Sequence, residues 1–272
     1  NSSDGMNSMC AAIKTLPPEV VHMIAAAEVI DSIAAVAREL VENALDAGAT
    51  RFSVSVWPEA WGLVVVDNGC GMNLDSLQVA ATAHSTSKIN NLDDLRQIAS
   101  LGFRGEALHS LAQLSQLEIK SRTPGGEGWR VEYDAQGIPV EVKPAGMAAG
   151  TIVTVADLFG SWEARRMALP SLAQQMRSLQ QTVEQIALCY PHMSWQVQKN
   201  DRRWFTINPG KTAQQILPQM ARGVDVTDLQ HKKVAIDSQQ HLKLVLGLPD
   251  RCHRKQPDWV KVAINGRMVK AP

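Results

Sequence analysis

The chain has 272 residues, of which 45% are hydrophobic and 20% charged, a composition typical of a folded globular protein of one or two domains. The four cysteines form no Cys-x-x-Cys pair and have no histidines at zinc spacing, which argues against a zinc site and favours free thiols. No apolar run approaches the roughly 20 residues that cross a bilayer. The N-terminus lacks the pattern of a signal peptide, so we expect residues 1–15 to be a disordered leader. We expect a protein of the bacterial cytoplasm; a eukaryotic relative would be nuclear.

The net charge of zero hides an uneven distribution along the chain. Residues 1–200 carry 14 Lys and Arg against 21 Asp and Glu, whereas residues 201–272 carry 13 against 6. This asymmetry indicates two modules, the second of which could face a polyanion. Chance clustering of surface charge is the alternative.

Hydrophobic periodicity, punctuated by glycine and proline, divides the chain into helices and strands. Helical spacing is found at 17–30, 32–47, 73–81, 92–100, 105–114, 170–189 and 212–218. Strand-like runs are found at 52–57, 62–67, 117–122, 128–134, 139–144, 151–159, 194–198, 202–207, 242–248 and 259–266. This order predicts an α+β fold, a mixed sheet covered by helices on one face, followed by a smaller unit that starts near residue 195.

The helix at 32–47 carries the first candidate site. At 3.6 residues per turn, Glu39, Asn43 and Asp46 fall within roughly 60° of one another, opposite an apolar side. A carboxylate and a carboxamide one turn apart suit a general base and a metal ligand. Taken alone, the same pattern describes a solvated helix face.

Two glycine motifs carry the rest of the candidate site. The strand at 62–67 ends in Asp-x-Gly-x-Gly, a sharp turn that suits the wall of a ligand pocket, although tight turns of this kind are common. Residues 101–108, LGFRGEAL, place glycines before a helix N-terminus, where backbone amides can cradle phosphates. This motif is also weak alone.

Together these motifs resemble the MutL family of DNA mismatch-repair ATPases. The likeness rests on RELVENALDAGAT (38–50), DNGCGM (67–72), HSTSKI (84–89), LGFRGEAL and GTIVTV (150–155). It implies a Bergerat-type α/β sandwich of the GHKL superfamily at 16–195. It also implies a transducer-like second domain at 196–272, resembling a ribosomal-S5-like fold and incomplete at its C-terminus.

The resemblance implies an ATP and Mg²⁺ site and assigns its residues. Glu39 would be the general base that deprotonates the attacking water, and Asn43 would hold Mg²⁺. Asp67 would accept a hydrogen bond from the adenine amino group, helped by the hydroxyl of Thr151. The other implied members lie beside the adenine ring, in the lid over the ATP and in the glycine loop over the phosphates. They are Gly69, Gly71, Met72, Thr86, Ser87, Lys88, Gly102, Phe103, Arg104, Gly105, Glu106 and Ala107.

The sequence departs from the family pattern at three places. Ala27 stands where the family has glycine, and residues 161–163, Ser-Trp-Glu, replace Asn-x-Pro, where we expect a change to a surface loop. The family's lysine that reaches the γ-phosphate lies beyond the matched part. Because the chain ends at Pro272, we expect it to bind nucleotide better than it hydrolyses it.

The resemblance also implies partners. These are DNA bound without sequence preference, a mismatch-recognition protein of the MutS type, and a second subunit in a nucleotide-dependent homodimer or related heterodimer. We expect no membrane contact. For DNA, Arg267 in the family-like Asn-Gly-Arg segment is the first candidate, with Arg254 and Lys255 beside it. Two alternatives remain, a scaffold that binds nucleotide without hydrolysis and the ATPase region of a type II topoisomerase, whose loop sequences differ from these.

Overall fold

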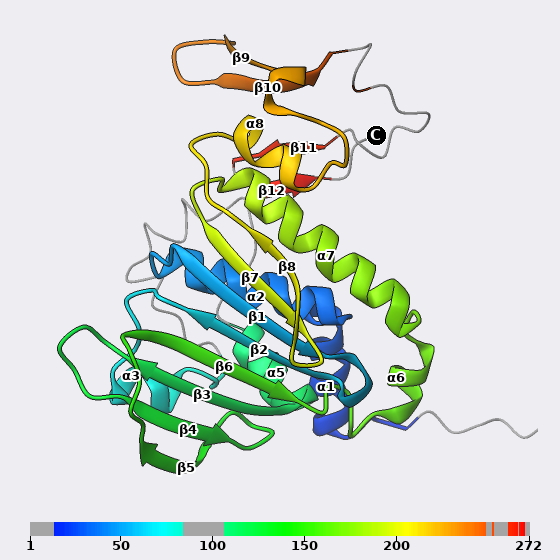
Figure 1. The fold of residues 1–272 in the computed structure, drawn as a ribbon. Coiled ribbons are helices and arrows are strands. Elements are labelled where there is room, and N and C mark those ends of the chain that lie inside the picture. The colour runs from blue at the N-terminus through cyan, green and yellow to red at the C-terminus, as the bar shows by residue number, and fades with distance from the viewer. Residues whose placement is uncertain (1–13, 84–105, 249–251, 253–260, 266, 270–272) are drawn as a thin grey trace, which may run out of the picture.

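The computed structural model describes residues 14–83, 106–248, 252, 261–265 and 267–269 (Figure 1). The helices are α1 (Pro18–Val29), α2 (Ile33–Asp46), α3 (Leu74–Val79), α5 (Ala107–Leu114), α6 (Glu163–Ala168), α7 (Leu172–Cys189) and α8 (Ala213–Ile216). The strands are β1 (Arg51–Trp57), β2 (Gly62–Asp67), β3 (Gln116–Arg122), β4 (Trp129–Tyr133), β5 (Pro139–Pro144), β6 (Gly150–Ala156), β7 (Ser194–Lys199), β8 (Arg202–Ile207), β9 (Leu229–Ala235), β10 (His241–Gly247), β11 (Val262–Ile264) and β12 (Arg267–Val269). Single 3₁₀ turns occur at Pro58–Ala60, Leu217–Gln219 and Val226–Asp228.

Eight of these strands form one mixed sheet in the order β5-β4-β3-β6-β2-β1-β7-β8. The pair β1 and β7 is parallel, and every other neighbouring pair in the sheet is antiparallel. The predicted mixed sheet is therefore confirmed.

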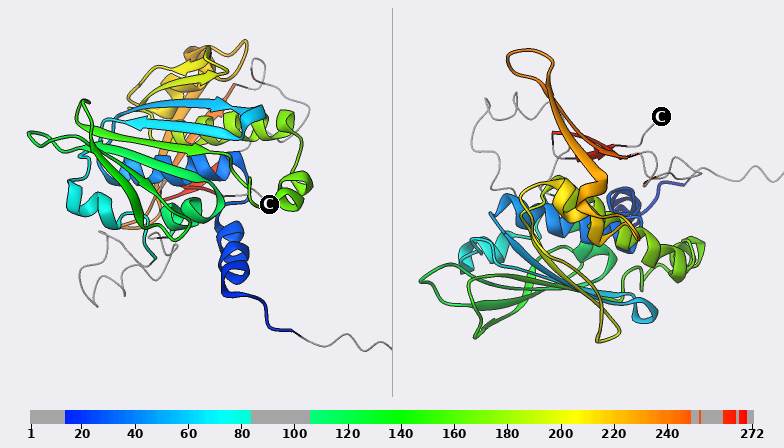
Figure 2. Two further views of the ribbon diagram at one scale, coloured as in Figure 1. Left: turned by 90° about the horizontal axis from the view of Figure 1, so that it is seen from below. Right: turned by 45° about the horizontal axis from the view of Figure 1, so that its top comes forward.

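The buried face of the sheet is built from alternating apolar residues that stand in register across six strands. Side chains that follow one another across neighbouring strands form one such row, each no more than 7% exposed: Val131, Ile119, Val153, Val65, Val54 and Val197. Because successive residues of a strand point to opposite faces, this register commits one whole face to the core. Helices α2, α5 and α7 lie on this side of the sheet (Figures 1 and 2).

The opposite face carries polar and charged side chains in the alternate register. Glu118, Glu132 and Glu141 stand side by side on three neighbouring strands. Arg130 reaches all of them, with its Nε 2.8 Å from Glu118 Oε2 and its Nη1 3.7 Å from Glu141 Oε2. This cation offsets the repulsion that three adjacent carboxylates would otherwise suffer. In the part of the chain that the structure describes, helices α2, α5 and α7 cover the apolar face, as the sequence predicts.

The sheet does not stop at the predicted boundary near residue 195. Strands β7 and β8 continue it to Ile207, and the buried Trp195 stacks on Phe52 of β1 with ring centroids 4.6 Å apart. The edge of the sheet therefore lies about twelve residues beyond the boundary at 195/196. The division into two domains stays a prediction.

Beyond β8, two small antiparallel pairs, β9–β10 and β11–β12, accompany α8 at one end of the molecule (Figure 1). The sequence pattern does not predict β9, because His231, Lys232 and Lys233 interrupt its alternation. Strand β6 ends at Ala156, short of the predicted residue 159, because Asp157 and Phe159 adopt positive φ angles of 53° and 59°. Within the described residues, no single helix is long and apolar enough to span a membrane; α1 and α2 qualify only together, bent by 77°.

Candidate functional site

Helix α2 supplies the predicted base and metal ligand. Its first turn is capped by Ser32, whose Oγ accepts from the amide of Ala35 at 3.1 Å. One side of the helix is buried through residues such as Leu40 and Ala44, and this side fixes how the helix lies on the sheet. Glu39 and Asn43 are half-buried on the other side.

The turn after β2, residues 67–72, is tied to α2 and folds back on Asp67. The amide of Gly69 donates to Asp67 Oδ1 at 2.8 Å. The amide of Cys70 donates at 2.9 Å to the carbonyl of Ala47, the C-cap residue of α2. The turn therefore docks on the same helix that carries Glu39 and Asn43.

The Asp67 carboxyl is half-buried at the entry of β6. Asp67 stands directly opposite Thr151 in the register of β2 and β6. Burial raises the pKa of Asp67, and hydrogen bonds from the amides of Gly69 and Thr151 oppose that rise without cancelling it. The structure thus brings the predicted Asp67 and Thr151 together around a carboxylate that water solvates poorly.

Three glycines are required here by close backbone approach within the protein. A Cβ on Gly71, at φ +68°, would lie 2.0 Å from the carbonyl oxygen of Arg122. A Cβ on Gly150, at φ +135°, would lie 2.1 Å from the carbonyl oxygen of Asp67. A Cβ on Gly69 would lie 2.9 Å from Asp67 Oδ1. The resemblance implied that Gly69 and Gly71 lie beside the adenine. The structure adds that these two glycines and Gly150 let the turn, β3 and β6 pack together.

Ser121, which the sequence argument missed, joins these parts. Ser121 is fully buried on β3, and its Oγ accepts from the amide of Met72 at 2.8 Å. The same Oγ donates to the carbonyl of Gly150 at 2.9 Å, so the hydroxyl of Thr151, 2.8 Å away, is the donor in the third contact. The available signal was a polar residue in the buried register of the strand, where the other two positions are Leu117 and Ile119.

Asn68 was also missed, and it fixes the other flank of the turn. Its Oδ1 accepts from the amides of Thr50 and Arg51, both at 2.8 Å, and its Nδ2 donates to Thr50 Oγ1 at 2.9 Å. The start of β1 is thereby held against the end of β2. An Asx side chain bonding to backbone amides of a distant segment leaves no signature in local sequence.

The predicted phosphate loop is described only at its end. Glu106 precedes α5, and Ala107, its first residue, is buried. The Nδ1 atom of His109 on α5 lies 2.9 Å from the carbonyl oxygen of Ala81, which fixes the start of α5 near the end of α3. The predicted Thr86, Ser87, Lys88, Gly102, Phe103, Arg104 and Gly105 lie outside the described residues, as do Arg254 and Lys255; of Arg267 only the backbone is described.

The departures from the expected pattern lie in or against the core. Ala27 is 6% exposed within α1, so its methyl group contributes to packing. Trp162, expected on a surface loop, is half-buried and packs against the hydrophobic core at the start of α6. Ser161 and Glu163 on either side are exposed, so the segment lies at the surface as expected, and Trp162 alone of the three turns toward the core.

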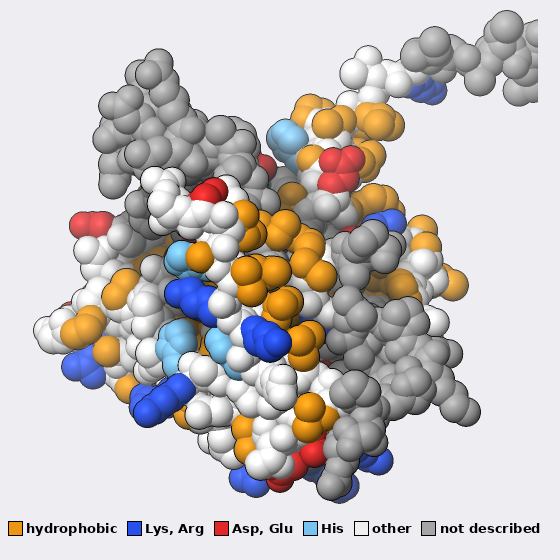
Figure 3. Space-filling model, turned by 90° about the horizontal axis from the view of Figure 1, so that it is seen from above, with side chains coloured by type: hydrophobic (Ala, Val, Ile, Leu, Met, Phe, Trp, Pro, Cys, Tyr) orange, Lys and Arg blue, Asp and Glu red, His pale blue; other side chains and the backbone are white. Residues whose placement is uncertain are grey.

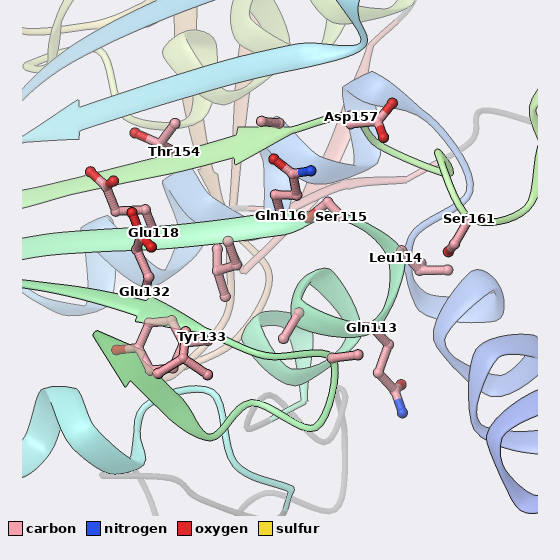
Figure 4. A pocket seen from close by; sticks show the side chains of 15 residues that line it. Gln113, Leu114, Ser115, Gln116, Glu118, Glu132, Tyr133, Thr154, Asp157 and Ser161 are labelled. Atoms are coloured by element: carbon pink, nitrogen blue, oxygen red, sulfur yellow. The ribbon is translucent and has the colours of Figure 1, made fainter. Parts of the chain in front are cut away.

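Two cavities of the described residues lie away from these groups. One, of about 500 Å³, opens at the ends of β3, β4 and β6, where Glu118, Glu132, Thr154 and Asp157 line it (Figure 4). The other, of about 280 Å³, lies between α2 and α7 and includes Glu42. Neither contains Glu39, Asn43 or Asp67. Among the residues described, no group of three or more His, Cys, Asp or Glu side chains could hold a metal ion.

Comparison with known proteins finds similarity to an ATPase family and to DNA mismatch-repair proteins. Residues 31–138 match the family described as "Histidine kinase-, DNA gyrase B-, and HSP90-like ATPase". The DNA mismatch repair protein MutL of Nostoc punctiforme is 56% identical over 97% of this chain and 50% of its own length. The DNA mismatch repair protein MutL of Actinobacillus pleuropneumoniae is 35% identical over 95% of this chain and 42% of its own length. The chain thus spans about half the length of these curated relatives.

Solved structures share the fold at lower identity. The Aquifex aeolicus MutL ATPase domain complexed with ADP has a TM-score of 0.66 and 23% identity, over 89% of this chain and 85% of that one. The N-terminal domain of a DNA repair protein has a TM-score of 0.68 and 22% identity, over 81% of this chain and 66% of that one.

Replacing Gly71 by Ala should destabilise the fold by about 2–4 kcal/mol, since a Cβ there meets both a positive φ and the Arg122 carbonyl. Gly125 is the matched control, because it has φ +74° and open space around it. Gly125→Ala should cost only about 1–2 kcal/mol. Urea midpoints measure both variants. Equal losses would show that close packing of the turn is not what requires Gly71.

Replacing Asp67 by Asn tests the half-buried carboxylate in the absence of nucleotide. A raised folded-state pKa means that the ionised group is less favourable in the fold than in the unfolded chain. Wild-type stability should therefore rise relative to Asp67→Asn as pH falls from about 7 to about 4. Urea unfolding at several pH values measures the difference. If the wild type lost stability relative to the variant over this range, the carboxylate would be stabilised by its hydrogen bonds instead.

Proposed function

The chain belongs to the MutL family of DNA mismatch-repair proteins, and we propose that it binds ATP with Mg²⁺ and hydrolyses it by attack of a water molecule on the γ-phosphate. The predicted family and the predicted ATPase domain of the GHKL type are confirmed by the similarities above. The residue roles, the metal and the partners belong to the proposal.

One observation carries the proposal. The turn that holds Asp67 is hydrogen-bonded to the end of the helix that bears Glu39 and Asn43. Two motifs that are weak alone therefore belong to one rigid unit, with a carboxylate at each end. The matched family segment, residues 31–138, contains both ends.

At the α2 end, Glu39 would orient the attacking water and accept its proton, a role that needs a carboxylate within hydrogen-bond reach of that water. Asn43 offers a neutral carboxamide oxygen on a half-buried side of the helix. Such an oxygen can be a ligand of Mg²⁺ when phosphate oxygens and water molecules complete the coordination shell of the ion. The ion would offset the negative charge that develops on the phosphate oxygens. Amides at the start of α5, beside Glu106 and Ala107, suit the phosphates.

At the other end, the Asp67 carboxylate would accept a hydrogen bond from the exocyclic amino group of adenine. Guanine presents a carbonyl oxygen at that position, so the same carboxylate would disfavour it. Thr151 donates its hydroxyl hydrogen to Ser121, which leaves the lone pairs of Thr151 Oγ1 available to accept a further hydrogen bond from water or ligand. Met72 would pack beside the base.

For the whole protein we extend the proposal to its partners. Family membership supports sequence-independent DNA binding, contact with a mismatch-recognition protein of the MutS type, and nucleotide-dependent dimerisation. The curated relatives cited above are bacterial, which supports action at the DNA of a bacterial cytoplasm.

Glu39→Ala should lower ATP turnover by about 10²–10⁴-fold, the usual contribution of a general base, while leaving nucleotide binding close to wild type. Glu42→Ala is the matched control, because Glu42 lies on the same helix but lines the cavity toward α7. Phosphate release measures turnover, and thermal shift with Mg²⁺ and ATP measures binding. Comparable turnover in Glu39→Ala and Glu42→Ala would remove Glu39 from the base role.

A further inference from the structure

The antiparallel ribbon of β9 and β10 carries four of its five Lys and His side chains on one face. Its register pairs Lys233 with Lys243, and His231 and His241 stand two positions away on the same face. Residues 230–243 are exposed throughout, and the base of the ribbon is held by Leu229, which is buried. Lys, Arg and His side chains gather on this end of the molecule (Figure 3).

The lysine pair is a local conflict within the fold. Cβ atoms of directly opposed residues lie about 4.5–5.5 Å apart, and like charges at that distance destabilise a strand pair. Within the described part of the chain, neither Lys233 nor Lys243 forms an ion pair. The one carboxylate of residues 229–248, Asp237, accepts from the amides of Gln239 and Gln240 in the turn, both at 2.8 Å. An external anion is what this face can use to offset the repulsion.

The opposite face of the ribbon is mostly apolar, with Lys232 and Gln230 as its polar members. Val234, Leu242 and Leu246 occupy the alternate register, and each is at least 45% exposed. A lipid surface would have to receive apolar side chains and cations together, with the charges beside the apolar patch. The lysine pair lies on the face away from Val234, Leu242 and Leu246, and only Lys232 among the five Lys and His side chains of the ribbon stands on their face. Contact through the lysine pair therefore leaves these three apolar residues outside it. This arrangement favours a polyanion without an apolar phase.

We propose that the face formed by His231, Lys233, His241 and Lys243 binds the phosphate backbone of a nucleic acid. Two ammonium groups offer point charges to phosphate oxygens, and the imidazole rings add N–H donors. Contacts of this kind give affinity without sequence preference. The inference rests on the proposed function only in taking DNA as the polyanion, and it names a surface separate from Arg254, Lys255 and Arg267.

The test compares single charge removals on opposite faces of the same ribbon. Lys243→Gln removes one charge from the proposed face, and Lys232→Gln removes one from the apolar face. Binding of the full chain to a random-sequence duplex is measured by fluorescence anisotropy over a range of salt concentrations. The slope of log affinity against log salt should fall by about 1 for Lys243→Gln, by about 2 for K233Q/K243Q, and stay unchanged for Lys232→Gln.

Each other outcome overturns the inference. Equal changes for Lys243→Gln and Lys232→Gln would mean that net charge alone matters. Binding of anionic phospholipid vesicles in place of the duplex would mean a lipid partner. A wild type that binds no duplex would remove DNA from the proposed function as well, whereas normal binding with an unchanged slope in K233Q/K243Q would remove only the ribbon. Thermal stabilisation by ATP and Mg²⁺, followed in the same variants, reports separately on the nucleotide site.

Discussion

The packing of the 67–72 turn is the constraint on which the rest of the candidate site depends. Four separate parts of the chain meet at this turn: the end of α2, the start of β1, β3 through Ser121, and the entry of β6. Glycine is needed where the backbones approach most closely, since a Cβ at Gly71 or Gly150 would overlap a carbonyl oxygen. Asp67 therefore has little freedom to move toward water, and its carboxyl is kept in a position where burial opposes its charge.

Much of this could be predicted from sequence because the signals are local. The 3.6-residue period of α2 separates Glu39 from Leu40 without any knowledge of the fold, and Asp-x-Gly-x-Gly after an apolar run indicates a turn that leaves a strand. The alternation of valine and isoleucine likewise predicts the strands whose buried row holds the sheet together. Each of these features depends only on residues that are close together in the sequence.

What could not be predicted depends on contacts between distant residues. Strand β7 pairs in parallel with β1 although more than a hundred residues separate them, and nothing in the local pattern of residues 194–199 assigns it to that sheet rather than to a second unit. Ser121 acts through Met72, Gly150 and Thr151, which lie about 30 to 50 residues away in the sequence. Asn68 is a similar case, because its side chain accepts hydrogen bonds from the backbone amides of Thr50 and Arg51, which belong to a separate segment.

The central claim is that the Asp67 carboxylate, fixed in its turn, selects adenine. Calorimetric titration of the chain with ADP and with GDP, in the presence of Mg²⁺, tests this most directly because hydrolysis plays no part. A base that leaves the half-buried carboxylate unpaired forfeits about 1–3 kcal/mol, so ADP should bind about 5- to 150-fold more tightly than GDP. Equal affinities for the two nucleotides would contradict the account.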